Sequence, residues 1–136
     1  RELSPDTRVV AAEPDNSPVL GSGIPQVRDA NGVPAGSHPQ FRPHLMQGWS
    51  PDFVSNLTQA AVDEALIDEI VPVDGEAALV MARELARQEG IFVGISAGAN
   101  AWAAIEVAKK LGPDKNVVTI LCDTGERYFS LGEYFK

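Results

Sequence analysis

The sequence predicts an α/β fold in which a mostly parallel sheet has helices on both faces. Strand-like segments alternate with segments of helical periodicity between residues 7 and 122, which is the order typical of such folds. The segment 116–122 lacks charged residues and is rich in β-branched ones, as expected of a buried parallel strand. Residues 91–95 contain a glycine, and a serine and further small residues follow them. This order is typical of a strand-to-helix turn.

Four segments are predicted to be strands of this sheet. Residues 7–12 form an apolar run that ends before Pro14, and residues 67–73 form a second run rich in valine and isoleucine. Residues 91–95 and 116–122 complete the set. Between the first two strands, a stretch from residue 15 to residue 49 carries prolines and glycines at short intervals, so no long regular element is expected there. An irregular stretch of this length in a compact domain is often functional.

Three helices are predicted from the residues that can begin and end them. Ser50, Asp74 and Ser96 are the expected N-caps, because a short polar side chain can accept a hydrogen bond from a free N–H group of the first turn. Gly90 and Gly112 are the expected ends, since glycine readily adopts the left-handed conformation that terminates a helix. The predicted helices span residues 50–65, 74–90 and 96–111.

Composition limits the classes of function. The chain has 136 residues, enough for one domain of modest size, and a formal net charge of -8, which makes binding to nucleic acid improbable. No apolar run approaches the ~20 residues of a membrane span. Cys122 is the single cysteine, which fits a reducing compartment and predicts a cytoplasmic protein. His38 and His44 have no partners at metal-ligand spacing, so no metal site is predicted.

Ser96 is the candidate functional residue, and the sequence around it allows three interpretations. Gly94-Ile95-Ser96-Ala97-Gly98 matches the nucleophile elbow of α/β-hydrolases, but that family needs a histidine later in the chain and none follows Ser96. Ser96 could instead serve only as a helix cap. The third interpretation is a hydroxyl that forms a hydrogen bond with the ring nitrogen of a cofactor at the start of a helix.

Four segments carry motifs of one enzyme family. Residues 89–99 are similar to the pattern Glu-Gly-Ile-x-x-Gly-Ile-Ser-Ser-Gly-Ala, and residues 125–130 to the pattern Gly-Glu-Arg-Tyr-Leu-Ser. Residues 44–48 resemble a His-Lys-Ile-Gln-Gly loop, and residues 10–18 resemble the strand and loop after a phosphate-binding region. Together these motifs resemble the cysteine synthase (O-acetylserine sulfhydrylase) family of fold type II pyridoxal-phosphate enzymes.

The resemblance implies a cofactor, a fold and a set of site residues. The cofactor would be pyridoxal 5'-phosphate, and the fold an incomplete tryptophan synthase β-like domain. Ser96 would form a hydrogen bond with the pyridine nitrogen, while Gln47 and Gly48 would lie near the substrate. A serine does not hold a ring proton as a carboxylate does, so the ring would be a weaker electron sink, which suits β-replacement better than transamination.

The family resemblance also implies that this chain is one part of a longer enzyme. Residues 1–136 would be the C-terminal part of the enzyme, and the Schiff-base lysine, the substrate loop and the phosphate cradle would lie upstream, so no catalytic residue is expected here. The implied activity is replacement of the acetate of O-acetylserine by sulfide, giving cysteine, in a homodimer. The alternatives are a cystathionine β-synthase-like or other pyridoxal-phosphate β-replacement enzyme or lyase, and a non-catalytic interaction module. Leu45, found where the family often has lysine, leaves the substrate open.

Overall fold

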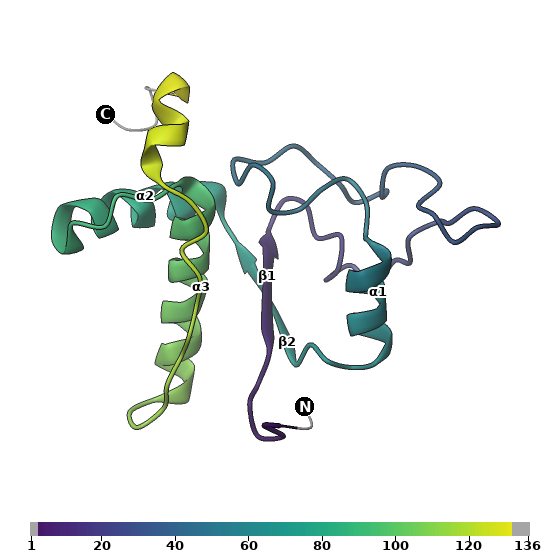
Figure 1. Cartoon of the computed structure of the whole chain (residues 1–136), viewed down its shortest axis with the longest axis horizontal. Helices are drawn as coiled ribbons and strands as arrows, with labels where there is room; N and C mark the ends of the chain where they lie inside the picture. Colours follow the sequence, from purple (N-terminus) through teal and green to yellow (C-terminus); the bar gives the residue numbers. More distant parts are fainter. Residues whose placement is uncertain (1–2, 132–136) are drawn as a thin grey trace. The chain divides into compact units, whose positions relative to one another are not determined.

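The computed structural model describes residues 3–131 of the chain, which divide into two compact units (Figure 1). The first unit contains the described residues up to Pro43 together with residues 50–72. The second contains residues 44–49 and the described residues from Val73 onward. Strands and helices are both present, and the α/β class predicted from the sequence is confirmed.

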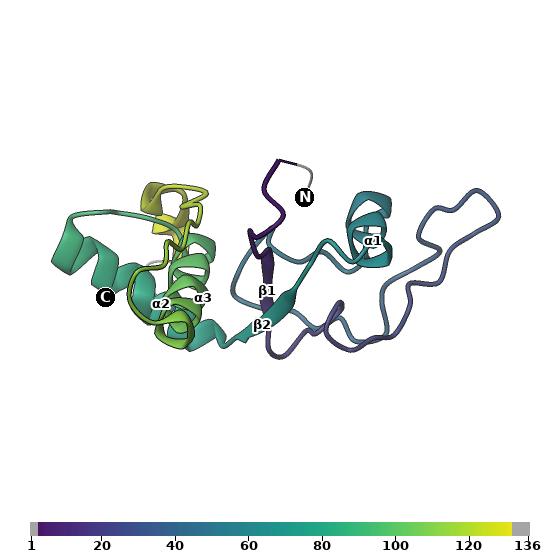
Figure 2. The same cartoon turned by 90° about the horizontal axis from the view of Figure 1, so that it is seen from below.

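Two short parallel strands form the sheet of the described residues. Strand β1 (Val10–Pro14) pairs with β2 (Glu69–Val73), and the two lie side by side in both views (Figures 1 and 2). Both contain a proline, Pro14 and Pro72, which a strand tolerates only where the missing N–H donor is not needed by a neighbour. In a two-stranded sheet, each strand has one edge with no neighbouring strand, where a missing N–H donor is tolerated. These strands confirm two of the four predicted ones, with β1 shifted toward the C-terminus.

The proline-rich stretch has an irregular backbone, as predicted, and buried polar side chains hold it in place. The carboxylate of Glu13, which is 4% exposed, accepts hydrogen bonds from the backbone N–H groups of Leu20 at 2.9 Å and Gly21 at 2.8 Å. The Oε1 atom of Gln26 accepts one from the backbone N–H of Val54 at 3.0 Å. Because these side chains satisfy backbone groups that no sheet or helix satisfies, the stretch is ordered without regular structure.

Helix α1 (Asn56–Asp63) begins later than predicted. Its N-cap is Ser55, whose side chain accepts a hydrogen bond from the N–H of the third helical residue. The prediction placed the cap at Ser50 and Asp52 in the first turn, and this was wrong. Asp52 instead stabilises the proline-rich stretch, because its backbone carbonyl oxygen accepts a hydrogen bond from the N–H of His38 at 2.6 Å.

The second unit is built on two helices joined by a short π-helical turn. Helix α2 (Gly75–Glu84) has Asp74 as its N-cap and continues into the π-helix Leu85–Glu89. Gly90 follows with a φ of 69°, the left-handed conformation predicted for the end of this helix. Helix α3 (Ile95–Leu111) follows and ends at Gly112, as predicted. None of the described helices combines the length and apolar character that a membrane crossing requires.

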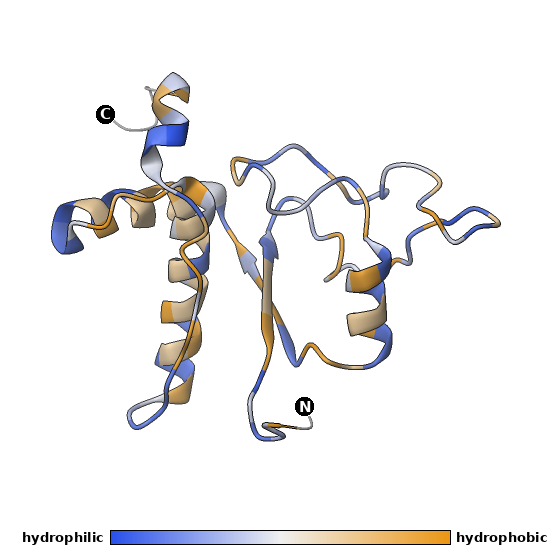
Figure 3. Ribbon diagram, in the orientation of Figure 1, coloured by the Kyte–Doolittle hydropathy of each residue, from blue (hydrophilic) through white to orange (hydrophobic). Residues whose placement is uncertain are grey.

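Helices α2 and α3 approach each other closely because small residues face one another. Ala82, Val93 and Ala97 form the buried core of this unit. A Cβ atom added at Gly98 would lie 2.2 Å from the carbonyl oxygen of Ala78 and 2.9 Å from the Cβ atom of Ala82. Figure 3 shows that α3 is apolar along much of its length. This packing fixes the start of α3, where Ser96 lies.

The other two predicted strands, 91–95 and 116–122, are wrong for the described residues. Val93 pairs only through an isolated antiparallel bridge with Thr124. The segment 116–122 forms no strand, and Val118 and Ile120 are 91% and 73% exposed. A strand needs a neighbouring backbone for its hydrogen bonds, and within residues 3–131 no strand lies beside this segment. It lies along α3 instead, where the Asn100 side chain donates to the carbonyl oxygen of Ile120 at 2.9 Å.

Candidate functional site

Ser96 lies in the first turn of α3, but it does not cap the helix. The N-cap is Gly94, which has an extended backbone (φ -78°, ψ 172°) and provides no side-chain hydrogen bond. The prediction of Ser96 as N-cap was therefore wrong by two residues. Ser96 is 6% exposed, and its hydroxyl contacts other side chains rather than the free N–H groups of the helix end.

A cluster of polar side chains surrounds Ser96, and we call Ser96, Asn100, Cys122, Asp123 and Tyr128 the α3 cluster. The Tyr128 hydroxyl donates to Oδ2 of Asp123 and also forms a hydrogen bond with the Ser96 hydroxyl. The Cys122 thiol lies 3.9 Å from Oγ of Ser96, and the Asn100 side-chain amide donates to Cys122 Sγ at 3.3 Å. The cluster joins the first turns of α3 to residues 122–123 and to the 3-10 helix Gly125–Leu131 that follows them.

Burial raises the pKa of the Tyr128 phenol above its ordinary value, and the hydrogen bond to Asp123 and the negative charge of that residue raise it further. The hydrogen bond from Ser96 acts in the opposite direction, because a donor to the phenol oxygen favours the ionised form. The raising effects are dominant. Tyr128 therefore keeps its proton at neutral pH and remains a donor toward Asp123.

The cluster is tightly packed against the backbone at the start of α3. A Cβ atom at Gly94 would lie 2.3 Å from Cε2 of Tyr128 and 2.4 Å from Oδ1 of Asp123, so only glycine fits at this position. Oδ1 of Asp123 is buried and has no hydrogen-bond partner among the described residues. A buried acceptor without a partner is costly and often marks a place that a ligand or water completes.

The sequence interpretation found Ser96 but missed most of the cluster. It treated Cys122 as a buried strand residue, whereas Cys122 is exposed and its thiol is free. It assigned Asp123 and Thr124 only to a turn after the predicted strand, although Thr124 is exposed beside the cluster. The signal available was the position of residues 122–128 directly after an apolar segment, where α/β folds place ligand-binding side chains.

Gln47 and Gly48, the predicted substrate-loop residues, lie on an exposed turn of the second unit. Gly48 has a φ of 76°, a left-handed conformation that favours glycine. The turn is anchored by Met46, which is 1% exposed, and by Leu45, whose side chain would be 3.3 Å from a Cβ atom at Gly75. The loop is therefore fixed to the start of α2, and its contact with a substrate stays a prediction.

The lysines of the described residues lie away from the α3 cluster. Lys109 and Lys110 are in the last turn of α3, about 20 Å along the helix from Ser96 at 1.5 Å per residue, and Lys115 follows the helix. Lys136 lies outside the described residues. Within residues 3–131, no three His, Cys, Asp or Glu side chains are arranged to hold a metal ion.

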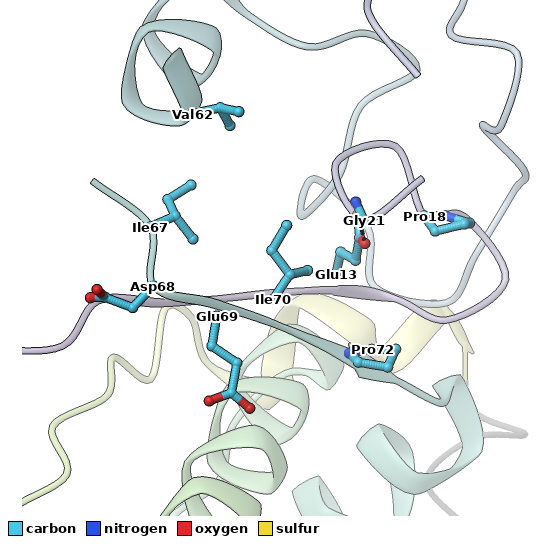
Figure 4. A pocket seen from close by; sticks show the side chains of 9 residues that line it. All are labelled: Glu13, Pro18, Gly21, Val62, Ile67, Asp68, Glu69, Ile70 and Pro72. Atoms are coloured by element: carbon cyan, nitrogen blue, oxygen red, sulfur yellow. Dashed lines mark hydrogen bonds between the residues drawn. The ribbon is translucent and has the colours of Figure 1, made fainter. Parts of the chain in front are cut away.

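A separate hollow of about 540 Å³ lies in the first unit, beside β2 (Figure 4). Its acidic groups are already engaged, since Glu13 holds two backbone N–H groups, Asp68 accepts from Val9 and Glu69 pairs with Arg8. It contains no residue of the predicted site. The lining residues are Glu13, Pro18, Gly21, Val62, Ile67, Asp68, Glu69, Ile70 and Pro72.

Comparison with known proteins identifies the family. Residues 1–123 match the family described as "Pyridoxal-phosphate dependent enzyme". The chain belongs to this family. It is 42% identical over 130 residues to a probable cysteine synthase of Bacillus subtilis (strain 168), a match that covers 96% of the chain and 35% of the relative. The chain thus spans about a third of the length of the curated relatives it matches.

Solved structures of the family have the same fold in this region. A structure of O-ureido-L-serine synthase with bound O-ureido-L-serine is 38% identical, with a TM-score of 0.72 over 96% of this chain and 34% of that one. A hydrogen sulfide-producing enzyme of Fusobacterium nucleatum is 31% identical, with a TM-score of 0.77 over 99% of this chain and 34% of that one. The tertiary structure of the described residues is therefore that of this enzyme family.

The α3 cluster fits one edge of the family's cofactor. A pyridine nitrogen needs one hydrogen-bonding group in a partly dry site, and the cluster offers the Ser96 hydroxyl beside a buried acceptor without a partner. Gly94 has no side chain, which lets Tyr128 and Asp123 pack against the start of the helix beside Ser96. The cofactor's aldehyde and phosphate ends need a lysine and an anion-binding loop, and residues 3–131 provide neither beside the α3 cluster.

Proposed function

We propose that the intact protein containing this chain is a cysteine synthase, which replaces the acetate of O-acetylserine by sulfide and gives cysteine and acetate. The observation that carries the proposal is the 42% identity to a probable cysteine synthase over nearly the whole chain. The α3 cluster supports it, because Ser96, the residue for which the sequence motif predicts a contact with the ring nitrogen, lies among polar side chains.

The chain contributes to this reaction by binding and orienting groups. Pyridoxal phosphate, when bound, supplies the electron sink that makes the α-proton of an amino acid acidic and lets a β-substituent leave. Ser96 holds the nitrogen edge of the ring, and the packing of α3 on α2 keeps Ser96 in place. The lysine that would bind the cofactor and move the α-proton is proposed to lie outside these 136 residues.

Gln47 and Gly48 are proposed to contact the substrate. Their turn is exposed and its backbone is fixed by the buried Met46 side chain, so a side-chain amide and a backbone N–H are presented without a large entropic cost. Such groups suit the carboxylate of an amino acid. The single cysteine and the acidic net charge support a cytoplasmic protein, and a homodimer is proposed on the resemblance alone.

The activity is tested by incubating the intact protein with O-acetylserine and one nucleophile at a time, and identifying the products. With sulfide, we expect cysteine and acetate in equal amounts, only when pyridoxal phosphate is present. Homocysteine as nucleophile tests the cystathionine β-synthase alternative. If no nucleophile gives a product and the protein does not retain the cofactor, the non-catalytic alternative is correct.

A second activity has a specific observation in its favour. The chain is 38% identical to O-ureido-L-serine synthase, a value close to its identity with the cysteine synthases. Hydroxyurea is the nucleophile whose oxygen, replacing the acetate at the β-carbon of O-acetylserine, would give O-ureido-L-serine and acetate. A rate with hydroxyurea above the rate with sulfide would assign this second activity in place of cysteine synthesis.

A further inference from the structure

Residues 27–35 form a short β-hairpin within the proline-rich stretch. Arg28 and Pro34 pair through an isolated antiparallel bridge, and the chain turns at residues 30–32 between them. Gly32 has a φ of 75°, which is the left-handed conformation. A three-residue loop that ends in a left-handed glycine is a common hairpin connection, so the sequence specifies an ordered turn here.

Asn31, at this turn, carries a side-chain amide that is chemically labile. Asn31 is exposed and is followed by Gly32, and no other asparagine of the chain precedes a glycine. The backbone nitrogen of the next residue can attack the side-chain carbonyl carbon of an asparagine, because the two groups are held in one short segment. A following glycine hinders this attack least, since it has no side chain.

The reaction that follows from this attack needs only water as a co-reactant. A bond forms between the Gly32 nitrogen and Cγ of Asn31, and the bond from Cγ to the amide nitrogen breaks. The proton from the Gly32 nitrogen leaves with that amide group as ammonia, and a cyclic imide remains. Water then opens the imide at either of its carbonyl carbons and gives aspartate or isoaspartate. Nothing is oxidised or reduced, and the chain gains one negative charge.

Asp29 opposes the first step of this reaction. Its Oδ1 atom accepts hydrogen bonds from the backbone N–H groups of Asn31 at 2.8 Å and Val33 at 2.9 Å, on both sides of the attacking nitrogen. Its backbone carbonyl oxygen accepts from the N–H of Gly32 itself at 3.0 Å. The Gly32 nitrogen must give up this hydrogen bond before it attacks, and the adjacent carboxylate disfavours the negative charge that forms there.

We propose that Asn31 is a deamidation site and that Asp29 sets its rate by holding the turn closed. The modification converts Asn31 to aspartate or isoaspartate slowly and irreversibly while the turn is formed, and quickly once the turn opens. The inference does not depend on the proposed function, because it uses only the hairpin and water.

The isoaspartate product would detach the hairpin from its anchor. The Arg28 guanidinium donates to the carbonyl oxygen of Gly32 at 3.2 Å and to that of Val54, two residues before α1, at 2.8 Å. Isoaspartate continues the main chain through its side-chain carbon, which lengthens the backbone directly before Gly32. The Gly32 carbonyl group then moves away from Arg28, and the turn no longer closes.

The test is incubation of the intact protein in mildly alkaline buffer, with peptide mapping by mass spectrometry at intervals. We expect deamidation of Asn31 at least tenfold slower in the folded protein than in the same protein unfolded in guanidinium chloride. Asp29→Ala removes the side-chain acceptor and should raise the rate in the folded protein at least tenfold. Asp29→Asn keeps an oxygen acceptor at this position and should react more slowly than Asp29→Ala.

Asn116 is the internal control, because it is exposed but is followed by the β-branched Val117. It should remain unmodified in the folded protein and its variants. Equal rates at Asn31 in the folded and unfolded protein overturn the inference, as does an unchanged rate in Asp29→Ala. Faster reaction at Asn116 than at Asn31 in the unfolded protein overturns the assignment of the site.

These outcomes are independent of the enzyme assignment. The rate at Asn31 is measured without cofactor or substrate, so failure of the proposed function leaves the inference in place, and failure of the inference leaves the proposed function in place. The comparison of the folded with the unfolded unmodified protein is decisive by itself, so the inference stays testable if a variant does not fold.

Discussion

Replacing Gly98 by alanine should destabilise the protein by about 2 kcal/mol, within the usual range for overpacking a close contact. The new Cβ atom would lie 2.2 Å from the carbonyl oxygen of Ala78 and 2.8 Å from the backbone nitrogen of Ala82. Neither backbone atom can rotate away, so α2 and α3 must move apart. The gain of about 1 kcal/mol in helix propensity from glycine to alanine is smaller than this cost.

The midpoint of denaturant unfolding of the intact protein measures this effect. Gly36→Ala is the matched control, because among the described residues nothing lies within 4 Å of a Cβ atom at Gly36, and its backbone is not left-handed. The control should leave the midpoint almost unchanged. Equal stability of Gly98→Ala and the unmodified protein would show that α2 and α3 do not pack as described.

Replacing Gly94 by alanine should abolish retention of pyridoxal phosphate, with a loss of affinity greater than tenfold. The added Cβ atom would overlap Tyr128 and Asp123, which lie 2.3 Å and 2.4 Å from its position. Both side chains must move, and the hydrogen bond between Tyr128 and Asp123 beside Ser96 is then lost. Because the backbone of Gly94 is extended, alanine causes no conformational strain and only the overlap acts.

Retention is measured from the visible absorbance of the protein after gel filtration, together with its circular dichroism. Gly36→Ala again serves as the control and should keep the cofactor. If Gly94→Ala retains the cofactor as well as the unmodified protein does, the α3 cluster is not part of the cofactor site.

Local signals in the sequence were sufficient for the start of α2 and for the ends of the second unit's helices. Asp74 begins α2 and accepts a hydrogen bond from the N–H of Ala77 at 2.9 Å, as its residue type predicts. Gly90 and Gly112 follow the ends of helices for an equally local reason. Such signals depend on backbone groups within one turn, so they act independently of the rest of the structure.

The strand predictions failed where the local pattern was not sufficient. Residues 116–122 have the composition of a buried strand, yet Val118 is 91% exposed because no neighbouring strand is present in the described residues. The helix predicted to begin near Ser50 failed for a related reason. Asp52 forms hydrogen bonds with Ser37 and His38, partners distant in sequence that no local pattern contains.

The site was predictable in part. The motif around Ser96 indicated the residue and the start of a helix, because glycine and small side chains allow close packing there. The partners of Ser96 come from residues 122–128, and only the tertiary structure brings Asp123 and Tyr128 to it.

The central claim, that Ser96 holds one edge of the cofactor, is tested most directly by calorimetric titration of the intact apo-protein with pyridoxal phosphate. We expect Ser96→Ala to weaken binding by about 1 kcal/mol, which is about fivefold in affinity and the scale of one net hydrogen bond. Thr124→Val, which removes the exposed hydroxyl beside the cluster, should bind as the unmodified protein does. Unchanged binding in Ser96→Ala together with weakened binding in Thr124→Val would contradict the claim and assign the contact to Thr124.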